Sequence, residues 1–153
     1  MTEIVQQLGR APDHVLVAVS TTGTVGGCLR HIEQNSLPTQ VTAVDAEGSV
    51  LFDGHPGPRH LPGFGAGMVP ELSKGLQPHR VLRINDRDSV TGARSLVRTE
   101  AILPGASGGA VIAAVEKLKG EFAPGSDVVI VLHDSGTRYM DTIYNDDWVE
   151  ENL

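Results

Sequence analysis

The 153-residue chain has one cysteine, few aromatic side chains and more acidic than basic groups. The single cysteine, Cys28, excludes a disulfide within the chain, and its place in a predicted helix favours a small buried side chain over a reactive thiol. The aromatic content of 4% leaves little surface for stacking on single-stranded nucleic acid. The net charge of −7 argues against a phosphate-backbone partner and favours a cytoplasmic protein.

Long apolar runs are also missing, and none reaches the length that a bilayer-spanning segment needs. The first eight residues carry acid and amide side chains where a secretory signal has basic and apolar blocks. They predict a short amphipathic helix with Thr2 as its N-cap. Hydrophobic residues make up 40% of the chain, and a chain of this length can bury about 70% of its unfolded surface. We therefore expect one globular domain over residues 1–153, with no membrane partner.

Strand and helix patterns alternate along the sequence, which predicts an α/β fold. We expect a mostly parallel sheet with right-handed crossovers and helices on both faces. Apolar runs predict strands at 14–19, 41–44, 80–84 and 127–132. Amphipathic spacing predicts helices at 24–34, from a cap at Asp86 or Asp88 to Glu100, at 107–119, and around Trp148. The glycine- and proline-rich stretch 47–68 predicts a long loop, and such loops are usually functional.

Two turns rich in glycine and hydroxyl groups precede predicted helices. The first, Ser20-Thr21-Thr22-Gly23-Thr24, follows the first strand, at the end where parallel sheets bind ligands. Its backbone N–H groups, hydroxyls and positive helix end suit a phosphate monoester. A tight turn with a hydroxyl cap and no ligand accounts for these residues equally well. The second turn, Gly105-Ala106-Ser107-Gly108-Gly109, follows Pro104.

Nucleotide binding is one alternative for the first turn. Gly23, Gly26 and Gly27 open the helix, and Asp45 ends the next strand, near where a ribose-binding acid would lie. The glycine spacing differs from G-x-G-x-x-G, which weakens this dinucleotide module. A Walker A loop is excluded, because no Lys-Ser or Lys-Thr follows either turn.

Hydrolytic and metal chemistry are further alternatives. Ser107 satisfies G-x-S-x-G, the pattern of a serine hydrolase. The only later histidine is His133, and Pro104 disrupts the strand that such a nucleophile needs. A metal could also bind within the glycine- and proline-rich loop, although a solvated loop is the simpler interpretation. The side chains available there are Asp53, His55 and His60.

Four segments in chain order resemble the motifs of the fold-type II pyridoxal-phosphate enzymes of the cysteine synthase and cystathionine β-synthase family. The first turn looks like the family's phosphate loop, and Ser107 lies in a segment like the loop that hydrogen-bonds the pyridine nitrogen. The other two segments are similar to the Gly-Ile-Gly-Ala-Gly stretch beside the active site and to the carboxyl-terminal signature. They are Pro62-Gly63-Phe64-Gly65-Ala66-Gly67 and Asp134-Ser135-Gly136-Thr137-Arg138-Tyr139 with Trp148.

The resemblance implies that this chain binds pyridoxal 5′-phosphate and amino-acid substrates. The cofactor-binding residues would be Ser20, Thr21, Thr22, Gly23, Thr24 and Ser107. A neutral serine leaves the pyridine nitrogen unprotonated, which suits β-replacement on O-phosphoserine or O-acetylserine. Residues 44–52 look most like the diaminopropionate-pathway synthases, which join O-phosphoserine to glutamate for siderophores and peptide antibiotics.

The lysines depart from the family pattern. The family's Schiff-base lysine lies well before the phosphate loop, whereas this chain has only Lys74, Lys117 and Lys119, none at a matching position. We therefore expect the carboxyl-terminal half of an incomplete fold-type II large domain, inactive alone and binding the cofactor weakly and non-covalently. Unpaired strand edges would favour a complementary amino-terminal chain or a homo-oligomer. A non-catalytic partner that keeps the fold is the alternative.

Overall fold

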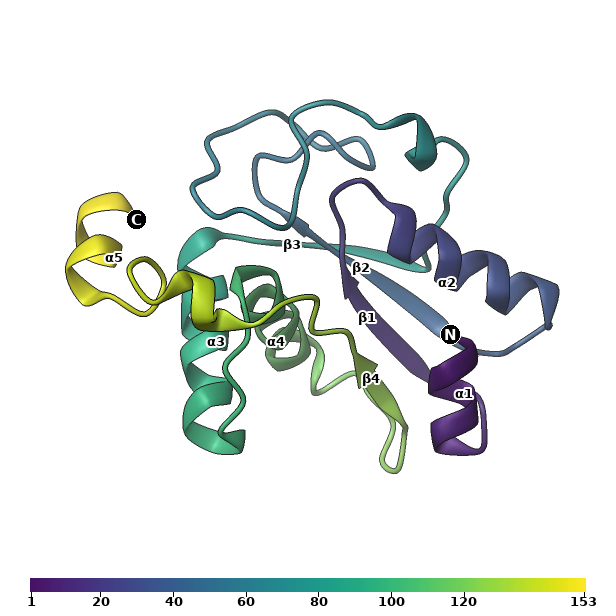
Figure 1. Ribbon diagram of the computed structural model, residues 1–153. Helices are drawn as coiled ribbons and strands as arrows, with labels where there is room; N and C mark the ends of the chain where they lie inside the picture. Colours follow the sequence, from purple (N-terminus) through teal and green to yellow (C-terminus); the bar gives the residue numbers. More distant parts are fainter.

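The computed structural model describes residues 1–153 and contains a four-stranded sheet in the order β3-β2-β1-β4 (Figure 1). The strands are β1 (His14–Ala18), β2 (Gln40–Ala46), β3 (Arg80–Ile84) and β4 (Val128–Ile130). All neighbours are parallel, and Val15 of β1 lies between Val41 and Val129. Parallel neighbours need crossover connections, which the helices provide. The predicted α/β fold with a parallel sheet is confirmed.

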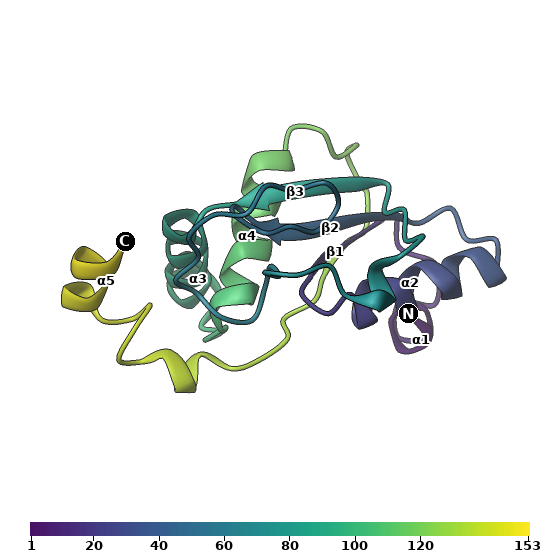
Figure 2. The same cartoon turned by 90° about the horizontal axis from the view of Figure 1, so that it is seen from above.

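Helices cover both faces of the sheet (Figure 2). The sheet-covering helices are α2 (Gly23–Gln34) on one face and α3 (Asp86–Glu100) and α4 (Ala106–Leu118) on the other. Leu16 and Ala18 of β1 join the buried cluster of α3 and α4, whereas Val17 and Val19 join that of α2. This alternation arises because successive strand side chains point to opposite faces. The apolar run after Pro12 therefore contributes to two cores.

The helices α3 and α4 pack closely because glycines face each other at their crossing. A Cβ on Gly92 would overlap the carbonyl of Gly109, and a Cβ on Gly109 would overlap the backbone of Ser89. The Ser89 hydroxyl donates a hydrogen bond to the Ala106 carbonyl at 2.6 Å. Both glycines therefore allow a backbone approach that a larger residue would prevent. This contact fixes the start of α4, where Ser107 lies.

Two predicted helix caps are wrong. Thr2 is the first residue of a helix whose N-cap is Met1, and its hydroxyl lies 3.4 Å from His31 Nδ1. The helix α3 is capped by Asn85, whose side chain accepts from the Asp88 N–H, so neither predicted aspartate caps it. Asparagine is as good an N-cap as aspartate, and Asn85 directly follows the strand.

The remaining elements are short, and the glycine- and proline-rich stretch is a loop as predicted. They are α1 (Thr2–Leu8), η1 (Glu71–Ser73), η2 (Gly136–Tyr139) and α5 (Asp146–Asn152). The last strand, predicted at 127–132, is shorter in the structure, and the three residues of β4 are half-buried. None of the helices combines the length and apolar character that crossing a membrane would require.

Candidate functional site

The first glycine turn lines a hollow of about 170 Å³ at the carboxyl end of β1. The structure brings all five residues of this turn, Ser20 to Thr24, to the hollow, together with Gly63 and His133. Gly63 comes from the long loop and His133 follows β4, so three separate segments meet here. The end of a parallel strand is where this fold class binds ligands.

Backbone N–H groups dominate the chemistry of this turn. Thr22, at the N-cap of α2, has a φ of +67°, and no side chain caps the helix. Its hydroxyl donates to the Thr21 carbonyl at 2.6 Å, and its side chain is buried. The N–H groups of residues 21 to 25 donate to no backbone carbonyl of the chain. Free donors at the positive end of a twelve-residue helix suit a phosphate group. The alternative of a tight turn with a hydroxyl cap is weakened, because no hydroxyl caps α2.

Gly63 connects this hollow to the second predicted site residue. It has a φ of +94°, in the left-handed region that favours glycine. A Cβ at this position would lie 3.6 Å from the Cβ and 3.7 Å from the Oγ of Ser107. Ser107 is 2% exposed and occupies the second position of α4. Gly63 is therefore next to both the turn at 20–24 and Ser107.

The loop that carries Gly63 is tied to the strand ends. The Gly65 N–H donates to the Val19 carbonyl at 2.6 Å, just before the first glycine turn. A Cβ on Gly65 would lie 2.7 Å from the Cβ of Ala46 and 3.0 Å from Nη1 of Arg59. The segment passes between the end of β2 and the Arg59 guanidinium, where no side chain fits. This contact holds the loop against the carboxyl end of β1.

The segment after β4 supports the second glycine turn. Pro104 and Ser135 form an isolated antiparallel bridge, and the Gly105 N–H donates to the Asp134 carbonyl at 3.1 Å. The Tyr139 hydroxyl donates to Asp134 Oδ2 at 2.7 Å. Burial and the neighbouring Asp134 raise the pKa of Tyr139 to about 12, so its hydroxyl stays protonated. The sequence resemblance identified this segment as a signature without a role, and the structure shows that it positions the second glycine turn.

The serine hydrolase alternative is not supported. His133 lines the first hollow, and its imidazole hydrogen-bonds to the backbone of Ala18. Desolvation lowers the pKa of His133, so its ring is neutral at pH 7. Ser107 does not line this hollow, and no hydrogen bond joins it to His133, so the two do not form the nucleophile–base pair that such an enzyme needs.

The dinucleotide alternative fails at its ribose-binding residue. Asp45 is completely buried, and its Oδ1 accepts from the Ala46 N–H at 2.9 Å. Burial raises the pKa of the Asp45 carboxyl, while a hydrogen bond from Ser49 opposes this shift. A carboxyl group turned into the core cannot reach a ribose. The nearby charges that favour its ionised form come from Arg59 and Arg83.

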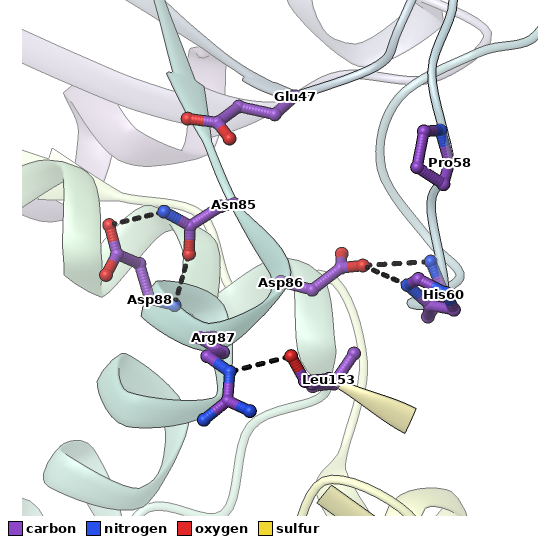
Figure 3. Close-up of a pocket in the computed structure, with 8 residues that line it drawn as sticks. All are labelled: Glu47, Pro58, His60, Asn85, Asp86, Arg87, Asp88 and Leu153. Carbon is purple, nitrogen blue, oxygen red and sulfur yellow. Dashed lines mark hydrogen bonds and ion pairs between the residues drawn. The ribbon is translucent and has the colours of Figure 1, made fainter. Parts of the chain in front are cut away.

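A larger hollow of about 440 Å³ lies beyond the carboxyl ends of β2 and β3 (Figure 3). Within it, Asp86 Oδ2 accepts from the His60 backbone N–H at 2.9 Å and lies 3.0 Å from His60 Nδ1. His60 therefore pairs with Asp86 and does not form the metal site considered with Asp53 and His55. No group of three or more His, Cys, Asp or Glu side chains is arranged to hold a metal ion. None of the predicted cofactor-binding residues lines this hollow.

The three lysines all lie in surface ion pairs. Lys117 lies 2.8 Å from Asp88, and the other two pair within their own turns of chain. None of them lines the hollow at the first turn. The hollow at the first turn therefore offers a place for a phosphate group, but no lysine of this chain lies beside it.

The comparisons define the class of protein. The family model described as "Pyridoxal-phosphate dependent enzyme" matches residues 1–134, so the chain belongs to the pyridoxal-phosphate dependent enzyme family. The resemblance inferred from the four motifs is confirmed at the level of this family.

Two solved structures are similar to the chain. An O-acetylserine-dependent cystathionine β-synthase from Helicobacter pylori is 29% identical, with a TM-score of 0.85, over 94% of this chain and 47% of that chain. An O-ureido-L-serine synthase is 23% identical, with a TM-score of 0.84, over 97% of this chain and 50% of that chain, a likeness that concerns the fold alone. The chain spans about half the length of each.

Proposed function

We propose that the turn at 20–24 and Ser107 hold pyridoxal phosphate in an enzyme that performs β-replacement on O-phosphoserine or O-acetylserine. The supporting observation is Gly63, which lines the hollow of the first turn and also lies next to Ser107. The free N–H groups of residues 21 to 25 would bind the phosphate group. Membership of the pyridoxal-phosphate dependent enzyme family supports this cofactor.

The chain's own residues would bind and orient the cofactor. The pyridoxal ring, when bound, supplies an electron sink for bonds at the amino-acid α- and β-carbons. Ser107 would hold the pyridine nitrogen through a neutral hydroxyl, which moderates that sink and suits β-replacement. Gly63 would leave space beside the ring, because it carries no side chain. The loop anchored by Gly65 would keep this space open.

We propose that the Schiff-base lysine is supplied by polypeptide outside these 153 residues. The support is the position of the three lysines, all in surface ion pairs away from the hollow. On this proposal the chain alone is inactive, and it binds the cofactor weakly and non-covalently. It would be completed by a complementary amino-terminal polypeptide or within a homo-oligomer. A partner that only regulates an intact relative is the alternative, and co-purification distinguishes the two.

More specifically, we propose that the completed enzyme joins O-phosphoserine to glutamate. This reaction makes a diaminopropionate precursor for siderophores or antibiotics. The assignment depends on the Ser-Thr-Thr-Gly-Thr form of the first turn and on residues 44–52. The similar H. pylori synthase is described as O-acetylserine-dependent, which is consistent with β-replacement on a serine ester. Product analysis with the completed enzyme, O-phosphoserine and glutamate tests this assignment.

Cofactor binding tests the proposed site on the chain alone. Titration with pyridoxal phosphate, followed by absorbance, should give saturable binding, and pyridoxal without its phosphate should bind at least about tenfold more weakly. Borohydride reduction and mass spectrometry should then find no stoichiometric adduct on Lys74, Lys117 or Lys119. Equal affinity for the two compounds would contradict the phosphate site, and a stoichiometric adduct would contradict the missing lysine.

A further inference from the structure

A third hollow of about 400 Å³ lies between the long loop, η2 and α5, and it shares no lining residue with the phosphate-turn hollow. Its volume is within the usual range for small-molecule sites. The two hollows are neighbours, because Pro62 of this one precedes Gly63 of the other. Six of its seven lining residues are His60, Leu61, Pro62, Arg138, Tyr139 and Trp148.

The charge available in this hollow is positive. Arg138 is exposed and takes part in none of the ion pairs of the chain. Two carboxylates that contact residues of this hollow are already engaged: Asp86 with His60, and Asp134 with the Tyr139 hydroxyl. Neither carboxylate lines the hollow. In a chain of net charge −7, an unpaired guanidinium on a concave surface offers a fork of donors for a carboxylate.

Most of the remaining wall is apolar or aromatic, and His60 and Thr142 are its polar members. Leu61 is 4% exposed, and Trp148 and Tyr139 are half-buried against the main core. Aromatic rings provide large contact areas for an apolar ligand body, and the indole N–H is a further donor. The hollow thus combines the Arg138 guanidinium with a surface suited to a flat organic group.

We propose that this hollow is a binding site for a small organic carboxylate, with the carboxylate on Arg138 and the apolar body against Trp148 and Pro62. The site is distinct from the proposed cofactor site and does not depend on it. Because Tyr139 is within about van der Waals reach of the space beside Gly63, the ligand would sit next to the Ser107 side of the proposed cofactor site.

The chain carries its own reporter for this site, because Trp148 is the only tryptophan. We would titrate the chain with benzoate and, in parallel, with benzamide, its uncharged counterpart, at constant ionic strength. Tryptophan fluorescence should change in a saturable manner with benzoate, at an affinity at least about tenfold higher than for benzamide. Arg138→Gln should reduce the benzoate affinity to that of benzamide. Arg98→Gln, an exposed arginine near the end of α3, is the matched control and should leave it unchanged.

Three results would overturn the proposal. These are equal affinity for benzoate and benzamide, an Arg138→Gln variant with unchanged benzoate binding, and an equal response to acetate or chloride, which would show that charge alone is sensed. Circular dichroism establishes that Arg138→Gln is folded, as expected for an exposed side chain. The Arg138→Gln variant should bind pyridoxal phosphate as tightly as the unmodified chain. A failure of the carboxylate site is therefore distinguishable from a failure of the proposed cofactor site.

Discussion

Gly63 lies against Ser107: a Cβ on Gly63 would stand 3.6 Å from the Cβ of Ser107. Gly63 also lines the hollow formed by the first glycine turn. One loop residue therefore joins two helix starts that are more than eighty positions apart in the sequence. The arrangement depends on the loop being fixed by the Gly65 N–H at the end of β1.

The variant Gly63→Ala tests whether this glycine belongs to the site. Its φ of +94° disfavours alanine, so we expect a loss of about 1–2 kcal/mol of unfolding free energy in urea. The methyl group would also occupy space beside Ser107, so pyridoxal phosphate affinity should fall. Gly75→Ala is the matched control, because Gly75 has a φ of +75° and nothing within 4 Å of the added Cβ. Equal cofactor affinity in the two variants would contradict the assignment.

The variant Gly109→Ala tests the close contact of α3 and α4. The added Cβ would overlap the Ser89 backbone and lie 2.8 Å from the Cβ of Ala93, so the helices must separate. We expect a loss of about 1–3 kcal/mol of unfolding free energy, as for overpacked cores. Gly120→Ala, with nothing within 4 Å, should not destabilise the chain, and urea denaturation of both compares them. Similar stabilities of the two variants would show that the contact is looser.

The two tyrosines should titrate abnormally. Burial is the largest cause that raises the pKa values of Tyr139 and Tyr144 to about 12. Since the folded pKa values exceed those of the unfolded chain, this contribution to stability is complete below about pH 10 and is lost as the pH rises toward 12. An alkaline absorbance titration of the folded chain should show no tyrosinate step near pH 10. A tyrosinate step near pH 10 would mean that at least one of the two tyrosines is not buried as the structure shows.

The single cysteine should react slowly. Cys28 is 5% exposed in α2, and burial raises the pKa of its thiol. Both effects reduce the amount of accessible thiolate, which is the reactive form. Iodoacetamide at pH 8 should modify the native chain much more slowly than the urea-unfolded chain, as measured by mass spectrometry. Comparable rates would place Cys28 at the surface.

The fold could be predicted well where one physical signal dominated. The apolar run after Pro12 follows from burial on both faces, and the apolar residues at 80–84 also predicted a strand; both strands appear in the structure. The N-cap of α3 was less predictable, because asparagine and aspartate are equally good N-caps and lie next to each other here. In the structure Asn85 is the N-cap. Asp45 looked like a ligand because it ends a strand, but its burial depends on how the long loop folds over it.

The candidate site was predictable in its parts and not in its assembly. The hydroxyl- and glycine-rich turns are local patterns, and both begin helices. The contact between Gly63 and Ser107 depends on the path of a loop that has no periodicity to interpret. The same holds for the hollow beside Arg138 and Trp148, which forms only when the segment after β4 returns to the loop.

Nitrogen-15 NMR of the labelled chain during pyridoxal phosphate addition tests whether the turn at 20–24 and Ser107 form one cofactor site. We expect the amide signals of residues 21–25, Gly63 and Ser107 to shift together along one saturation curve. Inorganic phosphate should shift mainly the amide signals of residues 21–25, because it has no ring that could reach Ser107. Shifts confined to other parts of the chain, or shifts at 21–25 and Ser107 with different saturation curves, would contradict a single cofactor site.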